Sequence, residues 1–144
     1  MIKTIILTVL FVILDQVAKF QAAALIEEPM VFAKGHLIFQ KSFNTGIAFG
    51  LKIPQIAIIV LSFFIIAVLL HLIYSEMNLK RHTAVIGSSL ILGGALSNLV
   101  DRVMYGGVID FIGSKYWPTF NLADIFIVVG VAIIVIYNRR ALMK

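Results

Sequence analysis

Two long stretches without a charged residue constrain this chain more than any other feature. Residues 53–75 lie between Lys52 and Glu76, and residues 83–100 lie between His82 and Asp101. An apolar helix of about 18 residues or more is a candidate membrane span, because the hydrocarbon core is about 30 Å thick. The chain is also 61% hydrophobic and only 13% charged, against about 25% charged residues in soluble domains. The sequence therefore predicts a membrane protein.

Two further apolar segments carry aspartates. Residues 4–26 are interrupted by Asp15 and Lys19, and residues 121–138 contain Asp124 near their start. We therefore expect an all-α polytopic protein with four transmembrane helices, at about 4–26, 53–75, 83–104 and 121–138. The first segment also resembles a cleavable secretory signal, but the charged pair after its apolar run argues against that alternative. The four spans predict one membrane-embedded domain, residues 1–144, with the two longer loops, at about 27–52 and 105–120, on the same face.

The first of these loops has the pattern of a small β element. Residues 37–39 and 41–51 alternate in polarity, contain several aromatic residues, and are punctuated by Gly46 and Gly50. Such alternation is typical of short strands. Bare backbone polar groups are excluded from hydrocarbon, so the element is expected at the membrane interface or against protein.

The charge pattern indicates membrane lipids and not nucleic acid as the surrounding partner. The net charge is +5, but the lysines and arginines are scattered among helix ends, without a basic stripe interleaved with aromatics. An even number of spans places both termini on one side. The pairs Lys80/Arg81 and Arg139/Arg140 weakly favour the cytoplasm for that side, although the count of basic residues on the two faces is nearly equal.

The polar residues gather on the opposite side. This topology places all four aspartates of the chain there, together with three asparagines and an arginine: Asp15, Asp101, Asp110, Asp124, Asn44, Asn98, Asn121 and Arg102. Each has a structural alternative. Asn121 could cap a helix whose dipole Asp124 complements, Asp15 and Lys19 could form an i, i+4 pair, and Arg102 could anchor at headgroups. Their joint occurrence favours a functional site, because ionisable residues at spans are costly.

Two neighbouring aspartates can hydrolyse a peptide bond, since their repulsion and burial separate their pKa values and let the pair hold one proton. The chain has no cysteine, which excludes thiolate nucleophiles, and it has no His-Glu-x-x-His zinc motif. Two alternatives stay open at this point. A lipid phosphotransferase would hold Mg²⁺ between Asp101, Asp110 and Asp124 beside a phosphate on Arg102. A transporter or channel subunit would line its pathway with acids such as Asp15.

Five blocks in order carry a family resemblance. They are Asp-Gln-Val-Ala-Lys at 15–19, Asn-Thr-Gly-Ile-Ala-Phe at 44–49, Gly-Gly-Ala-Leu-Ser-Asn-Leu-Val-Asp-Arg at 93–102, Gly-Val-Ile-Asp-Phe at 107–111 and Phe-Asn-Leu-Ala-Asp at 120–124. Together the blocks resemble the motifs of bacterial lipoprotein signal peptidases, also called signal peptidase II. Ser97 departs from the glycine expected before Asn98, and we expect the helix packing to tolerate it.

The resemblance implies an aspartic endopeptidase of the bacterial cytoplasmic (inner) membrane that cuts prolipoproteins just before a cysteine carrying diacylglycerol. It implies Asp110 and Asp124 as the catalytic pair, with Asn44, Asn98, Arg102, Asn121 and Asp15 in substrate binding or active-site support. It also implies an outward-facing site with cytoplasmic termini, no metal or other cofactor, and possible inhibition by cyclic peptides. We expect the protein to act as a monomer.

Overall fold

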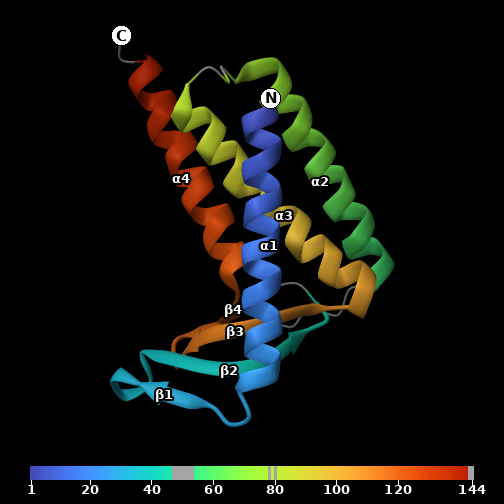
Figure 1. The fold of residues 1–144 in the computed structure, drawn as a ribbon, viewed down its shortest axis with the longest axis vertical. Coiled ribbons are helices and arrows are strands. Elements are labelled where there is room, and N and C mark those ends of the chain that lie inside the picture. The colour runs from blue at the N-terminus through green and yellow to red at the C-terminus, as the bar shows by residue number, and fades with distance from the viewer. Residues whose placement is uncertain (47–53, 78, 80, 143–144) are drawn as a thin grey trace.

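The computed structural model describes residues 1–46, 54–77, 79 and 81–142, except the side chains of Glu76 and of residues 137–142. Four long helices are present: α1 (Ile2–Leu25), α2 (Gln55–Glu76), α3 (His82–Tyr105) and α4 (Leu122–Leu142). Both chain ends lie at one end of the molecule and a small sheet lies at the other (Figure 1). Among the described residues, α1, α2 and α3 are long and apolar enough to cross a membrane, and the apolar part of α4 runs over Leu122–Ile136.

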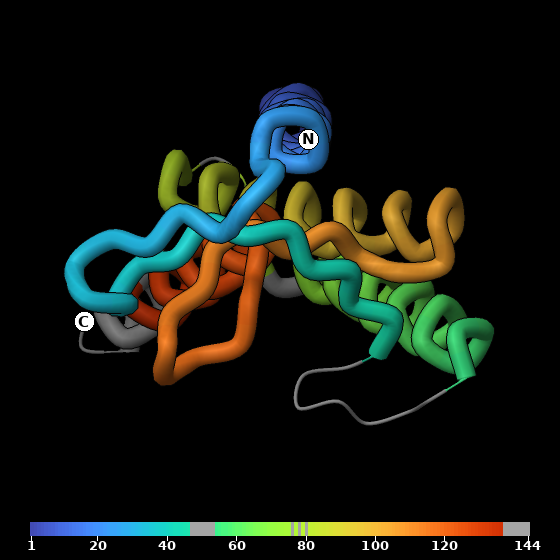
Figure 2. The backbone as a smooth tube through the Cα atoms, turned by 90° about the horizontal axis from the view of Figure 1, so that it is seen from below, coloured from blue at the N-terminus to red at the C-terminus, as the bar shows by residue number. Residues whose placement is uncertain are grey.

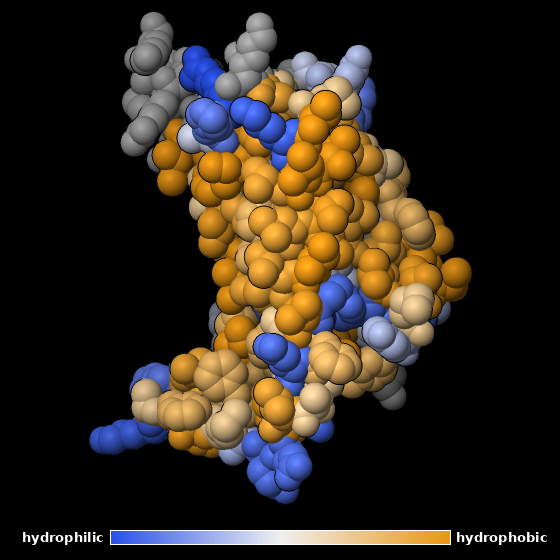
Figure 3. Space-filling view, in the orientation of Figure 1, coloured by the Kyte–Doolittle hydropathy of each residue, from blue (hydrophilic) through white to orange (hydrophobic). Residues whose placement is uncertain are grey.

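Helix α3 is the centre of the helical layer, because α1, α2 and α4 all pack on it. Its glycines allow close approach: a Cβ on Gly94 would lie 2.4 Å from the carbonyl oxygen of Ala123 in α4, and one on Gly93 would lie 2.7 Å from Cβ of Phe11 in α1. Small residues at helix contacts are typical of membrane bundles. Apolar side chains form a band around the visible face of the helices, with hydrophilic residues concentrated toward the two ends (Figure 3).

The sheet has four antiparallel strands in the order β1-β2-β3-β4, and it crosses the end of the helices (Figure 2). The first loop contributes β1 (Met30–Phe32) and β2 (Leu37–Asn44), joined by the 3-10 turn η1 (Ala33–Gly35). The second loop contributes β3 (Val108–Ser114) and β4 (Trp117–Phe120). The β element expected in the first loop is thus present as β1 and β2, and its predicted continuation over residues 47–51 lies outside the described residues.

The strands of the second loop were not predicted, and their partners explain why. Strand β3 pairs with β2 in the first loop, with Ser42 opposite Asp110, so its hydrogen bonds depend on a segment far away in the sequence. Phe111 of β3 packs with Ala22 and Ile26 at the end of α1. Between α3 and β3, Gly106 adopts a left-handed conformation (φ 77°) and its N–H caps the helix by donating to the carbonyl of Arg102. This turn directs the chain from α3 straight into β3.

Candidate active site

The two predicted catalytic aspartates come from different elements, Asp110 from β3 and Asp124 from the first turn of α4. Asn121 connects them. Its Nδ2 donates to Oδ1 of Asp110 at 2.7 Å, and its Oδ1 accepts the backbone N–H of Asp124 at 3.1 Å. Asp124 Oδ2 accepts the backbone N–H of Asn121 in return, at 3.3 Å. This is the reciprocal arrangement of a capping box, so the expected capping role of Asn121 coexists with its contact to the other aspartate.

Each aspartate also accepts a second amide. Asn44 of β2 donates from Nδ2 to Asp110 Oδ2 at 3.1 Å, and Asn98 of α3 donates from Nδ2 to Asp124 Oδ1 at 2.9 Å. The pKa of Asp110 is raised to about 6, chiefly by burial; the charge of Asp124 acts in the same direction, whereas the two asparagine donors lower it. The arrangement therefore combines two nearby carboxyl groups, one of which titrates close to neutral pH.

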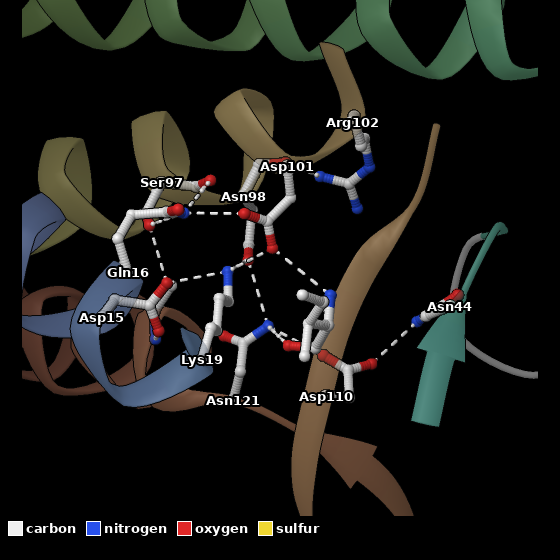
Figure 4. A network of polar contacts seen from close by, with 12 residues as sticks. Asp15, Gln16, Lys19, Asn44, Ser97, Asn98, Asp101, Arg102, Asp110 and Asn121 are labelled. Carbon is white, nitrogen blue, oxygen red and sulfur yellow. Dashed lines mark hydrogen bonds and ion pairs between the residues drawn. The ribbon is translucent and has the colours of Figure 1, made fainter. Parts of the chain in front are cut away.

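Arg102 lies in the last turn of α3, close to Asp101 (Figure 4). Its Nη1 donates to the carbonyl of Asn98 at 3.3 Å, within its own helix. The positive charge of the guanidinium interacts with both Asp110 and Asp124. Since one donor is used by the backbone of α3 and a guanidinium carries five, Arg102 has capacity to bind a polar group that approaches the aspartates.

Behind the pair lies a buried polar network between α1 and α3 (Figure 4). We call its two halves the α1 triplet (Asp15, Gln16 and Lys19) and the α3 triplet (Ser97, Asn98 and Asp101). Lys19 Nζ lies 2.7 Å from Asp15 Oδ2 and 2.8 Å from Asp101 Oδ2. It also donates to Asn98 Oδ1 at 2.9 Å. Asp15, Lys19 and Asp101 are at most 1% exposed.

Asp15 also binds the backbone at the start of α4. Its Oδ1 accepts the backbone N–H of Ala123 at 2.7 Å, and its Oδ2 accepts the hydroxyl of Ser97 at 2.6 Å. The first N–H groups of a helix lack intrahelical partners, so a carboxylate of α1 stabilises the first turn of α4. Asp15 thus supports the segment of α4 that carries Asp124.

Gln16 and Ser97 were missed as members of the supporting network. Gln16 Nε2 donates to Ser97 Oγ at 2.9 Å and to Asp101 Oδ1 at 2.6 Å, and Ser97 is fully buried. The helix packing tolerates Ser97, as predicted, but its hydroxyl is also a hydrogen-bond partner. A sequence signal was available: both triplets have the spacing i, i+1, i+4, which places all three members on one side of a helix.

The geometry does not support the magnesium alternative. Both oxygens of Asp101 are engaged, Oδ1 by Gln16 and Oδ2 by Lys19 and the backbone N–H of Ile109. Among the described residues, no group of three or more histidine, cysteine, aspartate or glutamate side chains is placed to hold a metal ion. A pair of hydrogen-bonded carboxyl groups remains, which is suited to acid-base chemistry.

Comparison with known proteins agrees with this geometry. Residues 7–139 match the family model described as signal peptidase (SPase) II. The chain is 33% identical to a lipoprotein signal peptidase of Moorella thermoacetica, over 90% of this chain and 88% of that one, and 36% identical to one of Clostridium tetani, over 92% and 90%. It also resembles a solved structure described as a bacterial membrane enzyme, with a TM-score of 0.81 and 28% identity over 95% of this chain and 87% of that one. The chain belongs to the signal peptidase II family.

Proposed function

We propose that this protein is an aspartic endopeptidase that removes the signal peptide from diacylglyceryl-modified prolipoproteins, cleaving just before the lipidated cysteine. The observation that carries the aspartic mechanism is the bridging of Asp110 and Asp124 by one side chain, Asn121. The family match and the names of the relatives support the substrate class. The same observations do not favour the lipid phosphotransferase or the transporter.

In the proposed reaction, Asp110 carries the proton that the pair shares, because burial raises its pKa to about 6. Ionised Asp124 takes a proton from water, and the water oxygen attacks the scissile carbonyl while Asp110 protonates the carbonyl oxygen. The tetrahedral intermediate then collapses: the C–N bond breaks, the nitrogen takes a proton from Asp124, and one hydroxyl of the intermediate returns its proton to Asp110. The products are the carboxyl end of the signal peptide and the free amino group of the lipidated cysteine.

The proposed topology has four spans in one membrane-embedded domain. Helix α4 has 21 residues, about 32 Å at a rise of about 1.5 Å per residue, which matches a hydrocarbon core of about 30 Å. We place both termini in the cytoplasm and the sheet at the outer face of the bacterial inner membrane. The substrate's signal helix enters laterally from lipid and presents its scissile bond to Asp110 and Asp124, with Arg102 beside it. The protein acts as a monomer, and a cyclic peptide that occupies this position inhibits it.

The decisive experiment is cleavage of a diacylglyceryl-modified prolipoprotein by the purified protein in detergent with excess chelator. Asp110→Asn and Asp124→Asn keep the side-chain shape and remove the acid, and Glu27→Gln is a matched control because Glu27 is an exposed acid outside the network. We expect wild type and the control to cleave and both aspartate variants to lose activity while remaining folded. Activity in either folded aspartate variant would remove that residue from catalysis, and a requirement for added metal would contradict the mechanism.

A further inference from the structure

The orientation of one amide, that of Asn98, decides how both catalytic carboxyl groups are held. Asn98 Nδ2 donates to Asp124 Oδ1 at 2.9 Å. Asn98 Oδ1 accepts Nδ2 of Asn121 at 3.1 Å, and the same Nδ2 reaches Asp110 Oδ1 at 2.7 Å. If the amide of Asn98 rotated by 180°, its NH₂ group would face the NH₂ of Asn121 and its oxygen would face a carboxylate. Both contacts would then be repulsive.

Lys19 determines that orientation. Its ammonium lies 2.9 Å from Asn98 Oδ1, and an ammonium has three donors and no acceptor. Only the oxygen of the amide can therefore face Lys19, which leaves the NH₂ group facing Asp124. Asn98 is 6% exposed and Lys19 is 1% exposed, so exchange of these contacts for water is restricted.

The charges around Lys19 hold it in place. Its other two close partners are the carboxylates of Asp15 and Asp101, at 2.7 and 2.8 Å. The three donors of the ammonium thus meet three acceptors, two charged and one neutral. A buried ion pair adds little net stability when compared with apolar residues of similar size, whereas it can specify one arrangement of neighbouring groups.

We propose that Lys19 is a positioning residue for the catalytic pair: its ammonium orients the Asn98 amide, which holds Asp124 directly and Asp110 through Asn121. This inference rests on the proposed function. The ammonium of Lys19 contacts Asn98 (Figure 4). Asn98 in turn contacts Asp124, so Lys19 acts on the position of the pair through Asn98.

The test variant must remove the ammonium without leaving a buried charge unpaired. Lys19→Met combined with Asp101→Asn removes one positive and one negative charge, so the net charge of the trio formed with Asp15 stays at −1. Asp15 keeps its donors from Ser97 and Ala123. A second variant, with Asp15→Asn added, makes the trio neutral and serves if the double variant does not fold.

The matched control is Gln16→Met. It removes three hydrogen bonds of the same buried network, two to Ser97 and one to Asp101, and none of the three involves Asn98. We expect this control to lose thermal stability and to keep the kcat of the wild type. A purely structural network predicts the same behaviour for the Lys19 variants.

The readout is kcat and KM for a diacylglyceryl-modified prolipoprotein in detergent, measured on variants whose folding is checked by thermal unfolding. We expect kcat to fall by about 10- to 100-fold with little change in KM, because misplacement of reacting groups by about 1 Å can cost that much. The alkaline limb of the pH profile is expected to move to higher pH. The charge of Lys19 and the hydrogen bond from Asn121 both lower the pKa of Asp110, so their loss raises it. The loss of the Asp101 charge offsets part of the Lys19 effect, and the charges of Arg102 and Asp124 are unchanged.

A folded Lys19 variant with the kcat and pH profile of the wild type would overturn the inference, as would an equal loss of kcat in Gln16→Met. Failure of the proposed function looks different. In that case the wild type does not cleave, or Asp110→Asn and Asp124→Asn remain active, whatever the Lys19 variants do.

Discussion

Gly94→Ala is expected to impair catalysis by moving the first turn of α4. A Cβ at this position lies 2.4 Å from the carbonyl oxygen of Ala123, against an ordinary contact of at least 3.4 Å, so the two helices must separate by about 1.0 Å. The obstacle is a backbone atom and cannot rotate away. If α4 moves along the direction of the hydrogen bond from Asn98 Nδ2 to Asp124 Oδ1, the distance between these two atoms grows from 2.9 Å to about 3.9 Å. This distance is beyond the range of a hydrogen bond.

We expect Gly94→Ala to reduce kcat by about 100-fold, the cost of a misplacement of about 1 Å. Overpacking should also lower the free energy of unfolding by about 1 to 3 kcal/mol. The assays are cleavage of a diacylglyceryl-modified prolipoprotein by purified protein and thermal unfolding in the same detergent.

Gly87→Ala is the matched control, because it overpacks the same interface between α3 and α4 two turns away. Its Cβ would lie 2.7 Å from Cδ1 of Ile134, the tip of a flexible side chain, and 3.2 Å from the carbonyl of Gly130. We expect it to lose stability and keep kcat. A Gly94→Ala protein with normal kcat, or equal losses of kcat in both variants, would refute the link between this helix contact and the proposed catalytic pair.

Three further predictions concern the pair itself. Because Asp110 has a pKa of about 6 and must be protonated to act as the acid, kcat/KM should fall as pH rises through about 6, with roughly a tenth of Asp110 still protonated at pH 7; a pH profile that stays flat from pH 5 to 8 would contradict this assignment. Asn44→Ala removes a donor that lowers the pKa of Asp110, so the alkaline limb should move to higher pH, and a shift to lower pH would show that Asn44 acts otherwise. Asn121→Ala removes both a helix cap and the link between the aspartates; we expect a loss of about 1 kcal/mol in stability and a larger relative loss of kcat, whereas a change in stability alone would confine Asn121 to capping.

The hydrophobic pattern was sufficient to predict the helical elements, because each long helix of a membrane protein must satisfy its own backbone hydrogen bonds within one continuous apolar segment. In the first loop, strand β2 also follows from the local alternation over residues 37–39 and 41–51, which does not extend to β1. By contrast, β3 and β4 were not predicted. Their pairing depends on β2 and on packing against α1, and such non-local partners leave no periodic signal in a segment of this length.

In the candidate site, too, some features follow from the sequence and others depend on tertiary contacts. The sequence alone placed four aspartates and their asparagine neighbours at one end of the molecule, because topology follows from the order of apolar spans. Topology by itself does not separate the members that support the site from those that carry chemistry, and that division was implied only by the family resemblance. Only the tertiary structure assigned Asp101 to Lys19, Asp15 to the start of α4, and Asn121 to a position between Asp110 and Asp124. A hydrogen bond forms only where donor and acceptor atoms come within about 3 Å of each other. Glycine contacts between helices and the register of paired strands set these distances. Neither is encoded in the local sequence.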